Sequence, residues 1–352
     1  MIVAMTRPML GRLTRDAEAP LLFESLFVAA VASFLGIRWF LASTGYPRVG
    51  SNGVHIAHML WGGLLMLLAL MLLIAFLDRS VQHLAAVIAG LGFGTFIDEI
   101  GKFVTSDNNY FYRPAIALIY CLFVVAFLVA RILIGQRRLS ETEALANALD
   151  LLEGTLDGPI EPEDRTRIER LLELANPKAP LVVFAKHYLA DLPQAAVRPS
   201  RVATVRRRLV AGYEVVMANP WAERVLGVGV VAYAAAAVLG VTLVAIETPV
   251  GGVAETSAVA TIAQVASTIA GAALVGRGVL SLRSSRAAAY HWFMRGLLVW
   301  ILVTQVFVFY SSQLAGLGGL VVDLVAYGSL RFAITREIVA GRGPSEAASR
   351  QA

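Results

Sequence analysis

Long apolar segments separated by shorter polar stretches run through most of the chain. A helix that crosses the hydrocarbon core of a bilayer needs about 20 mostly apolar residues. Eight segments reach that length: 21–43, 54–77, 83–104, 114–134, 225–247, 257–280, 289–311 and 314–333. The pattern therefore predicts an all-α fold, a polytopic integral membrane protein with eight transmembrane helices and a small cytoplasmic helical insert.

The composition supports a lipid bilayer as the main partner. Of the 352 residues, 57% are hydrophobic and 16% are charged, whereas soluble domains carry about 25% charged residues. The net charge of +5 does not indicate nucleic acid, because the basic residues lie at the ends of apolar segments, where orientation in the bilayer accounts for them. The one cysteine, Cys121, excludes an internal disulfide.

The distribution of arginine predicts the orientation of the helices. Loops on the cytoplasmic side of a membrane carry an excess of Lys and Arg. With the N-terminus inside, the outer loops hold mainly Arg48 and Arg113. The inner segments then hold Arg7, Arg12, Arg15, Arg79, Arg137, Arg138, Arg283, Arg286, Arg336 and Arg342. We expect a multi-pass protein of the cell membrane with both termini in the cytoplasm.

The apolar and polar stretches divide the chain into four parts. We predict an N-terminal membrane half over 1–134, a cytoplasmic insert over 135–220, a C-terminal membrane half over 221–336 and a disordered tail over 337–352. The tail is rich in Gly, Pro, Ser and Ala, which disfavour a packed structure.

The insert carries the signals of two amphipathic helices. Ser140 and Glu143 have the spacing of a capping box, and Gly154 ends the segment that follows. A second helix begins after Pro162 and stops at Asn176. Both have narrow apolar faces, so we expect a small helical bundle that leans on the membrane domain.

A basic cluster closes the insert just before the fifth apolar segment. Such clusters attract anionic lipid with about 1 kcal/mol per charge near the surface, although a solvated anchor that orients the next helix explains them more simply. The residues nearest this segment are Arg201, Arg206, Arg207 and Arg208.

The third apolar segment contains charged residues, which are costly in a bilayer and mark binding sites, transport paths or ion pairs. These residues are Asp98, Glu99 and Lys102. Asp98 shares one helical face with small residues of the kind that lets membrane helices approach closely. That face comprises Gly90, Gly94, Gly101 and Thr105, and we expect it to point Asp98 into the bundle.

Two histidines open the second apolar segment at the same predicted depth as Asp98. His55 and His58 are three residues apart and lie on one helical face, with Gly62 one turn deeper. Because a short hairpin joins the second and third segments, we expect their helices to be adjacent. The sequence thus predicts an outer-facing pocket of histidine and carboxylate.

One interpretation of this pocket is a metal-dependent membrane hydrolase. His55, His58 and Asp98 would hold a divalent metal such as zinc, with Glu99 as the general base. Lys102 or Arg113 would stabilise an anionic intermediate. The placing of His and Asp near one membrane face is similar to that in the seven-span zinc amide hydrolases of the ceramidase type, although the histidine spacing of that family is not reproduced.

Two other interpretations use the same residues. In a proton- or ion-coupled transporter or channel, a path would run from Asp98 to Asp323 and Gln305 in the C-terminal half; alternatively, Asp323 is a buried partner of Arg295. In a membrane scaffold or interaction protein, the charged groups would form satisfied contacts that fix a pair of helices. The sequence selects neither a substrate nor an oligomeric state.

Overall fold

A computed structural model describes residues 14–45, 57–107, 109–110, 112, 114–135, 138–155, 160, 162–193, 208, 211–213, 215, 219–247, 255–283 and 285–342. Every element formed by these residues is a helix, which confirms the all-helical class. The chain falls into two compact units. The first unit comprises residues 1–110 and 125–199, and the second comprises 111–124 and 200–352.

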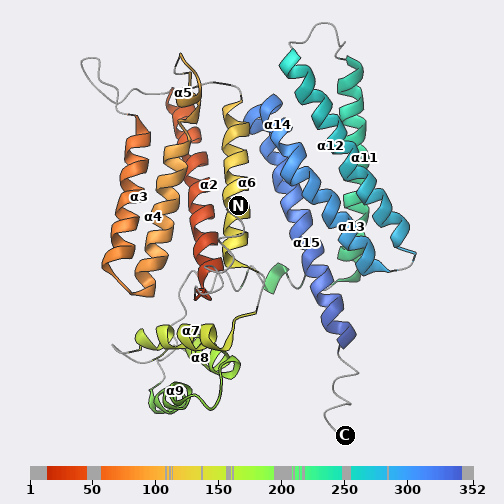
Figure 1. The fold of residues 1–352 in the computed structure, drawn as a ribbon. Helices are drawn as coiled ribbons and strands as arrows, with labels where there is room; N and C mark the ends of the chain where they lie inside the picture. The colour runs from red at the N-terminus through yellow and green to blue at the C-terminus, as the bar shows by residue number, and fades with distance from the viewer. Residues whose placement is uncertain are drawn as a thin grey trace, which may run out of the picture. The chain divides into compact units, whose positions relative to one another are not determined.

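The first unit contains the apolar helices of the N-terminal half, in which α2, α3 and α4 lie side by side (Figure 1). Large apolar side chains such as Leu64, Leu68 and Met71 of α3 are exposed, as expected for surfaces that face lipid. The helices are α2 (Ala19–Thr44), α3 (His58–Ala75), α4 (Arg79–Ile97), the short α5 (Ile100–Val104) and α6 (Ala115–Ile134), whose residues from Val125 onward belong to this unit.

Glycine lets α4 approach both of its neighbours. A Cβ atom on Gly90 or Gly94 would collide with the backbone of α2 around Ala30. On another side of α4, a Cβ on Gly92 would lie 2.7 Å from the carbonyl oxygen of Gly62 in α3. The predicted adjacency of α3 and α4 is therefore found, but the glycine face that carries Asp98 packs against α2 and not against the histidine helix.

The insert forms a three-helix bundle within the first unit. Its helices are α7 (Glu141–Glu153), α8 (Pro162–Leu174) and α9 (Pro180–Asp191). The predicted capping box is present, since Ser140 and Glu143 each accept a hydrogen bond from the other's backbone. Helix α9 has no counterpart among the predicted elements. Proline at its first position and the helical spacing of the buried Val182, Ala185 and Leu189 are the features of the sequence that indicate it.

The second unit contains the apolar helices of the C-terminal half. These are α11 (Pro220–Glu247), α12 (Glu255–Ser281), α13 (Arg286–Val299), a π-helical turn (Trp300–Thr304), α14 (Gln305–Ser312), a 3₁₀ turn (Gln313–Gly316) and α15 (Leu317–Arg342). Gln313 has a positive φ of 50°, and the chain reverses there, so that α15 runs back along the π-helical turn and α13 (Figure 1).

Among the residues that the structure describes, seven helical stretches are long and apolar enough to cross a membrane. The last of them, Arg286–Ile334, has 49 residues and includes both of the final predicted segments. A straight helix of that length would measure roughly 70 Å, more than twice the hydrocarbon thickness. The reversal at Gln313 instead divides the stretch into two legs, so the helical multi-span architecture is confirmed, while the number of eight spans and their orientation remain predictions.

Several predictions fall on residues outside the described set. These include the tail beyond residue 342, Arg113, His55, and Arg201, Arg206 and Arg207 of the basic cluster. Arg208 is described and its side chain is exposed. The division of the chain into four parts also stays a prediction.

Two neighbouring glycines of α3 allow the close approach of α3 and α4 to be tested. We expect Gly62→Ala to lower the melting temperature of the purified protein in detergent, because its Cβ would lie 2.6 Å from the Gly92 carbonyl oxygen and 2.6 Å from the Phe96 amide nitrogen. Overpacking of this kind costs about 1–3 kcal/mol. Gly63→Ala is the matched control, since nothing lies within 4 Å of its new Cβ. Equal shifts for both variants would contradict the packing described above.

Candidate functional site

A break in the helix places two carboxylates inside the first unit. Helix α4 ends at Ile97 and α5 begins at Ile100, so that Asp98 and Glu99 occupy the junction. Both acidic residues are 0% exposed. Glu99 has φ −87° and ψ 8°, a sparsely populated backbone conformation that is common at functional sites. The buried acids therefore need partners of their own.

Asp98 has partners on three other segments. The guanidinium of Arg38 in α2 donates from Nε to Oδ1, and a second nitrogen donates to the Asp98 carbonyl oxygen at 3.1 Å. Oδ2 lies 3.0 Å from Nε2 of His58 and accepts a hydrogen bond of 2.7 Å from the Tyr110 hydroxyl. Both carboxylate oxygens of Asp98 are thus occupied.

Glu99 is held by the start of α3 and by its own helix. The ammonium of Lys102 lies 2.6 Å from Oε1, and Nδ1 of His58 lies 3.3 Å from the same oxygen. Oε2 accepts a long hydrogen bond of 3.4 Å from the Met59 amide. An anion at the N-terminus of a helix is favoured by the exposed amides and the helix dipole, so Glu99 helps to cap α3.

Tyr110 covers both cations of the site. Its ring lies 4.6 Å from the guanidinium carbon of Arg38 and 5.5 Å from Nζ of Lys102, distances at which the face of an aromatic ring attracts a cation. Its ring also meets the His58 imidazole edge-on at 6.5 Å. We call the group of six residues Arg38, His58, Asp98, Glu99, Lys102 and Tyr110 the Asp98 cluster.

The fixed charges of the Asp98 cluster balance. Arg38 pairs with Asp98, and Lys102 pairs with Glu99. His58 touches both carboxylates, and its side chain is 26% exposed while theirs are 0% exposed. The imidazole therefore bridges two acids that each already have a cation of their own.

The structure brings four of the predicted site residues together: His58, Asp98, Glu99 and Lys102. Arg38 is not among the site residues predicted above, and a charged side chain near the end of the first apolar segment was the signal that could have found it. Within the part of the chain that is described, no group of three His, Cys, Asp or Glu side chains is arranged to hold a metal ion. Because His55 lies outside that part, the metal centre stays a prediction.

A second charged group lies at the opposite end of α4 and was not predicted as a site. Arg79, the first residue of α4, contacts Asp16 at 3.1 Å and Glu18 at 2.9 Å, and it also pairs with Asp150 of the insert. His83, one turn further along α4, lies 3.3 Å from Glu18. We call these five residues the Arg79 cluster.

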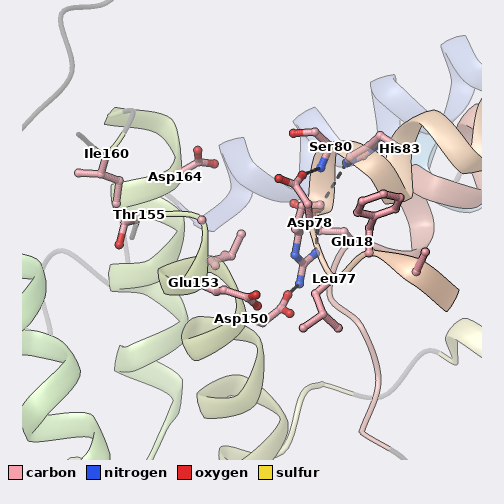
Figure 2. Close-up of a pocket in the computed structure, with 15 residues that line it drawn as sticks. Glu18, Leu77, Asp78, Ser80, His83, Asp150, Glu153, Thr155, Ile160 and Asp164 are labelled. Carbon is pink, nitrogen blue, oxygen red and sulfur yellow. Dashed lines mark hydrogen bonds and ion pairs between the residues drawn. The ribbon is translucent and has the colours of Figure 1, made fainter. Parts of the chain in front are cut away.

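The Arg79 cluster borders a cavity of about 790 Å³ between the insert and the ends of the apolar helices. Figure 2 shows Asp150, Glu153 and Asp164 on the insert side, and Asp78, Ser80 and His83 on the side of α4.

Further polar contacts fix the insert against the segment that precedes α2. Arg15 forms a bidentate ion pair with Glu143, in which Nε donates to Oε1 at 2.8 Å and Nη2 donates to Oε2 at 3.0 Å. The buried Asn147 accepts from the Ala17 amide at 2.7 Å and donates to the Arg15 carbonyl oxygen at 2.8 Å. Arg167 of α8 pairs with Glu18. The expectation that the insert leans on the membrane helices agrees with these contacts.

The acids in these contacts have lowered pKa values. The hydrogen bond from Arg15 holds the pKa of Glu143 well below its usual range. Burial alone would raise the pKa of Glu18, but the hydrogen bond from Arg79 and the charges of Arg167 and Arg79 outweigh it and lower the pKa. Both carboxylates therefore carry their charge at neutral pH and keep it as the pH falls into the mildly acidic range.

Comparisons with known proteins give no relative from which a function could be carried over. No family model matches the chain, and neither a curated protein nor a solved structure resembles it significantly. The geometry of the sites is thus the only basis for a functional conclusion.

We expect Arg79→Gln to loosen the insert. The variant loses charged contacts to Asp16, Glu18 and Asp150, and hydrogen bonds to charged groups contribute about 1.5–3 kcal/mol each. Hydrogen exchange followed by mass spectrometry should show faster exchange in α7. Arg165→Gln is the control, because Arg165 pairs with Glu169 inside α8 at 3.2 Å. Unchanged exchange in Arg79→Gln would contradict docking through the Arg79 cluster.

The lowered pKa values of Glu18 and Glu143 also predict the pH dependence of docking. A carboxylate whose pKa is lower in the folded state stabilises that state above the unfolded pKa, about 4.3 for Glu, and the contribution is lost as the pH falls through the folded value. Exchange in α7, corrected for the intrinsic rate, should stay constant from about pH 8 to about pH 5 and rise only below about pH 4. Loosening already at about pH 6 would contradict this assignment.

Proposed function

We propose that the Asp98 cluster is a proton-exchanging site and that the protein is a proton-coupled membrane transporter. One observation carries the proposal: the His58 imidazole contacts both buried carboxylates, each of which already has its own fixed cation. Ionisable groups that are buried near apolar helices are characteristic of proton relays and transport sites.

Hydrogen bonding explains why a proton suits this arrangement. A neutral imidazole has one N–H and can donate to only one acceptor, whereas the protonated ring donates from both nitrogens. Nε2 lies 3.0 Å from Asp98 and Nδ1 lies 3.3 Å from Glu99. The ring therefore satisfies both contacts when it carries a second proton, and it must give up one of them when that proton leaves.

The contacts favour a proton over a metal ion at Asp98. A carboxylate that binds a metal ion needs an oxygen lone pair directed at the ion. Oδ1 of Asp98 faces Arg38, and Oδ2 faces His58 and Tyr110. A metal ion in this place would have to displace the guanidinium that compensates the charge of Asp98 or the phenol that donates a hydrogen bond to it.

The break between α4 and α5 also favours transport. Discontinuous membrane helices with polar groups at the break form the binding sites of many transporters. Here the break coincides with the two buried acids. Asp323 and Gln305, the predicted continuation of the path, belong to the second unit, and a path that joins them to Asp98 remains a prediction.

Proton exchange at His58 predicts a specific infrared signal. When the pH is stepped between about 8 and about 5, the range in which histidines commonly change charge, the difference spectrum should contain imidazole bands together with shifted carboxylate bands. We expect His58→Gln to remove the coupled carboxylate shift. His187→Gln is the matched control, because the one hydrogen-bond partner of His187 in the described part of the chain is the Val183 carbonyl oxygen, at 2.9 Å. A carboxylate shift that persists in His58→Gln would overturn the assignment.

Transport itself is tested by proton flux into vesicles. Proteoliposomes with a trapped pH dye and a potassium diffusion potential should acidify faster than protein-free vesicles. Both His58→Gln and Asp98→Asn should abolish this difference, because each removes one of the two side chains between which the proton is exchanged. His187→Gln should retain the wild-type rate.

Two other outcomes would support the competing functions. A stoichiometric metal in the purified protein that is absent from His58→Ala would favour the metal-dependent hydrolase. No proton flux in the wild type, combined with a large loss of thermal stability in Asp98→Asn, would favour a structural role, since breaking a buried ion pair costs about 3–5 kcal/mol.

A further inference from the structure

The second unit contains a cavity that is separate from the Asp98 cluster. Its volume is about 580 Å³, and it lies among α11, α12, α14 and α15, within the size range of small-molecule sites. Much of its wall consists of small apolar side chains, including Ala236, Ala237, Val241, Val265, Val308 and Ala315. The wall therefore fits an apolar body.

Three polar side chains of the wall are satisfied by the protein itself. Trp300 donates from Nε1 to the Thr268 carbonyl oxygen at 3.2 Å. Thr304 donates to Ser267 at 3.0 Å, and Gln305 donates to the Gly316 carbonyl oxygen at 2.9 Å. Trp300 and Thr304 begin and end the π-helical turn, and such turns inside α-helices are frequent at functional sites.

Asp323 differs from these three side chains because one of its oxygen atoms has no hydrogen-bond partner in the described residues. Its side chain lines the cavity and the residue is 3% exposed. The Tyr233 hydroxyl is within hydrogen-bonding reach of the carboxyl group, but Oδ1 has no partner in the described part of the chain. Arg295, the counterion considered from the sequence, forms no ion pair with Asp323 and lies over the Trp292 ring, 4.4 Å from its centroid.

No Lys, Arg or His belongs to the described residues that line the cavity, and Asp323 is the one acidic residue among them. An uncompensated buried carboxylate is expensive, and it is relieved either by a proton or by a cation that enters the site. Buried acceptors in folded proteins nearly always have a donor. The unpartnered Oδ1 thus points to a missing N–H or O–H donor.

We propose that this cavity binds a small organic cation, a primary or secondary ammonium with an apolar body. The ammonium would donate to Oδ1 of Asp323 and neutralise its charge, and the apolar body would lie against the alanine and valine side chains. The site concerns the second unit alone and does not depend on proton transport at the Asp98 cluster.

Charge balance fixes the pH dependence of binding. A proton and an ammonium each neutralise the same carboxylate of Asp323, so that one cation replaces one proton when the ligand enters a protonated site. The other titratable groups near Asp323 are Tyr233 of α11 and Tyr120 of α6, whose hydroxyl donates to the Ile301 carbonyl oxygen. Because protons compete with the ammonium for one carboxylate, the ligand should bind more weakly as the pH falls.

The test is equilibrium binding of radiolabelled phenethylamine to the purified full-length protein in detergent. We expect saturable binding to the wild type, competition by unlabelled phenethylamine, and no competition by the neutral analogue 2-phenylethanol. Asp323→Asn should weaken binding at least about tenfold, because it keeps the size of the side chain but removes the charge that holds the ammonium. His187→Gln, in the first unit and outside both sites, should bind as the wild type does.

A second pair of variants tests the cavity without touching Asp323. Gly240 lines the cavity and Gly229 does not, and both lie in α11 with nothing within 4 Å of an added Cβ. Gly240→Leu should reduce binding by occupying the cavity, while Gly229→Leu should leave it unchanged. Wild-type affinity in Asp323→Asn, competition by the alcohol, or the absence of saturable binding to the wild type would each overturn the proposal.

Discussion

The cost of burying carboxylates among apolar helices governs the first unit. Asp98 and Glu99 are fully buried, and each is stable there only because a cation reaches it: Arg38 from α2 and Lys102 from α5. Arg38 can meet Asp98 only if α2 and α4 lie close together, and the glycines of α4 permit that approach. Electrostatics and close packing are therefore two parts of one constraint.

The same constraint acts at the other end of α4. Arg79 begins the helix and is compensated by Asp16, Glu18 and Asp150, and the last of these belongs to the insert. Charged residues thus lie at both ends of α4. Those at one end belong to the Asp98 cluster, and Arg79 at the other end forms an ion pair with the insert.

The acids of the two units have different surroundings, and this difference separates their proposed roles. Asp98 has a partner on both oxygens, and one of these partners is the histidine that carries the exchanging proton in the proposed function. Asp323 borders a cavity, has no ion pair and keeps one oxygen without a partner in the described residues. The first arrangement suits proton exchange within the protein, and the second suits an external cation.

The sequence by itself determined the all-helical membrane class, the capping box at Ser140, the adjacency of α3 and α4 and the presence of Asp98 and Glu99 in an apolar segment. Apolar length, helical spacing and local hydrogen-bonding motifs are properties of neighbouring residues, so they can be read along the chain. The tertiary structure decided which cation meets which acid, that the glycine face of α4 packs against α2, how Arg79 joins the insert and that Asp323 lacks Arg295 as a partner. These outcomes depend on rotations of one helix against another, and several pairings of the same charges satisfy the sequence pattern equally well until the helices are packed.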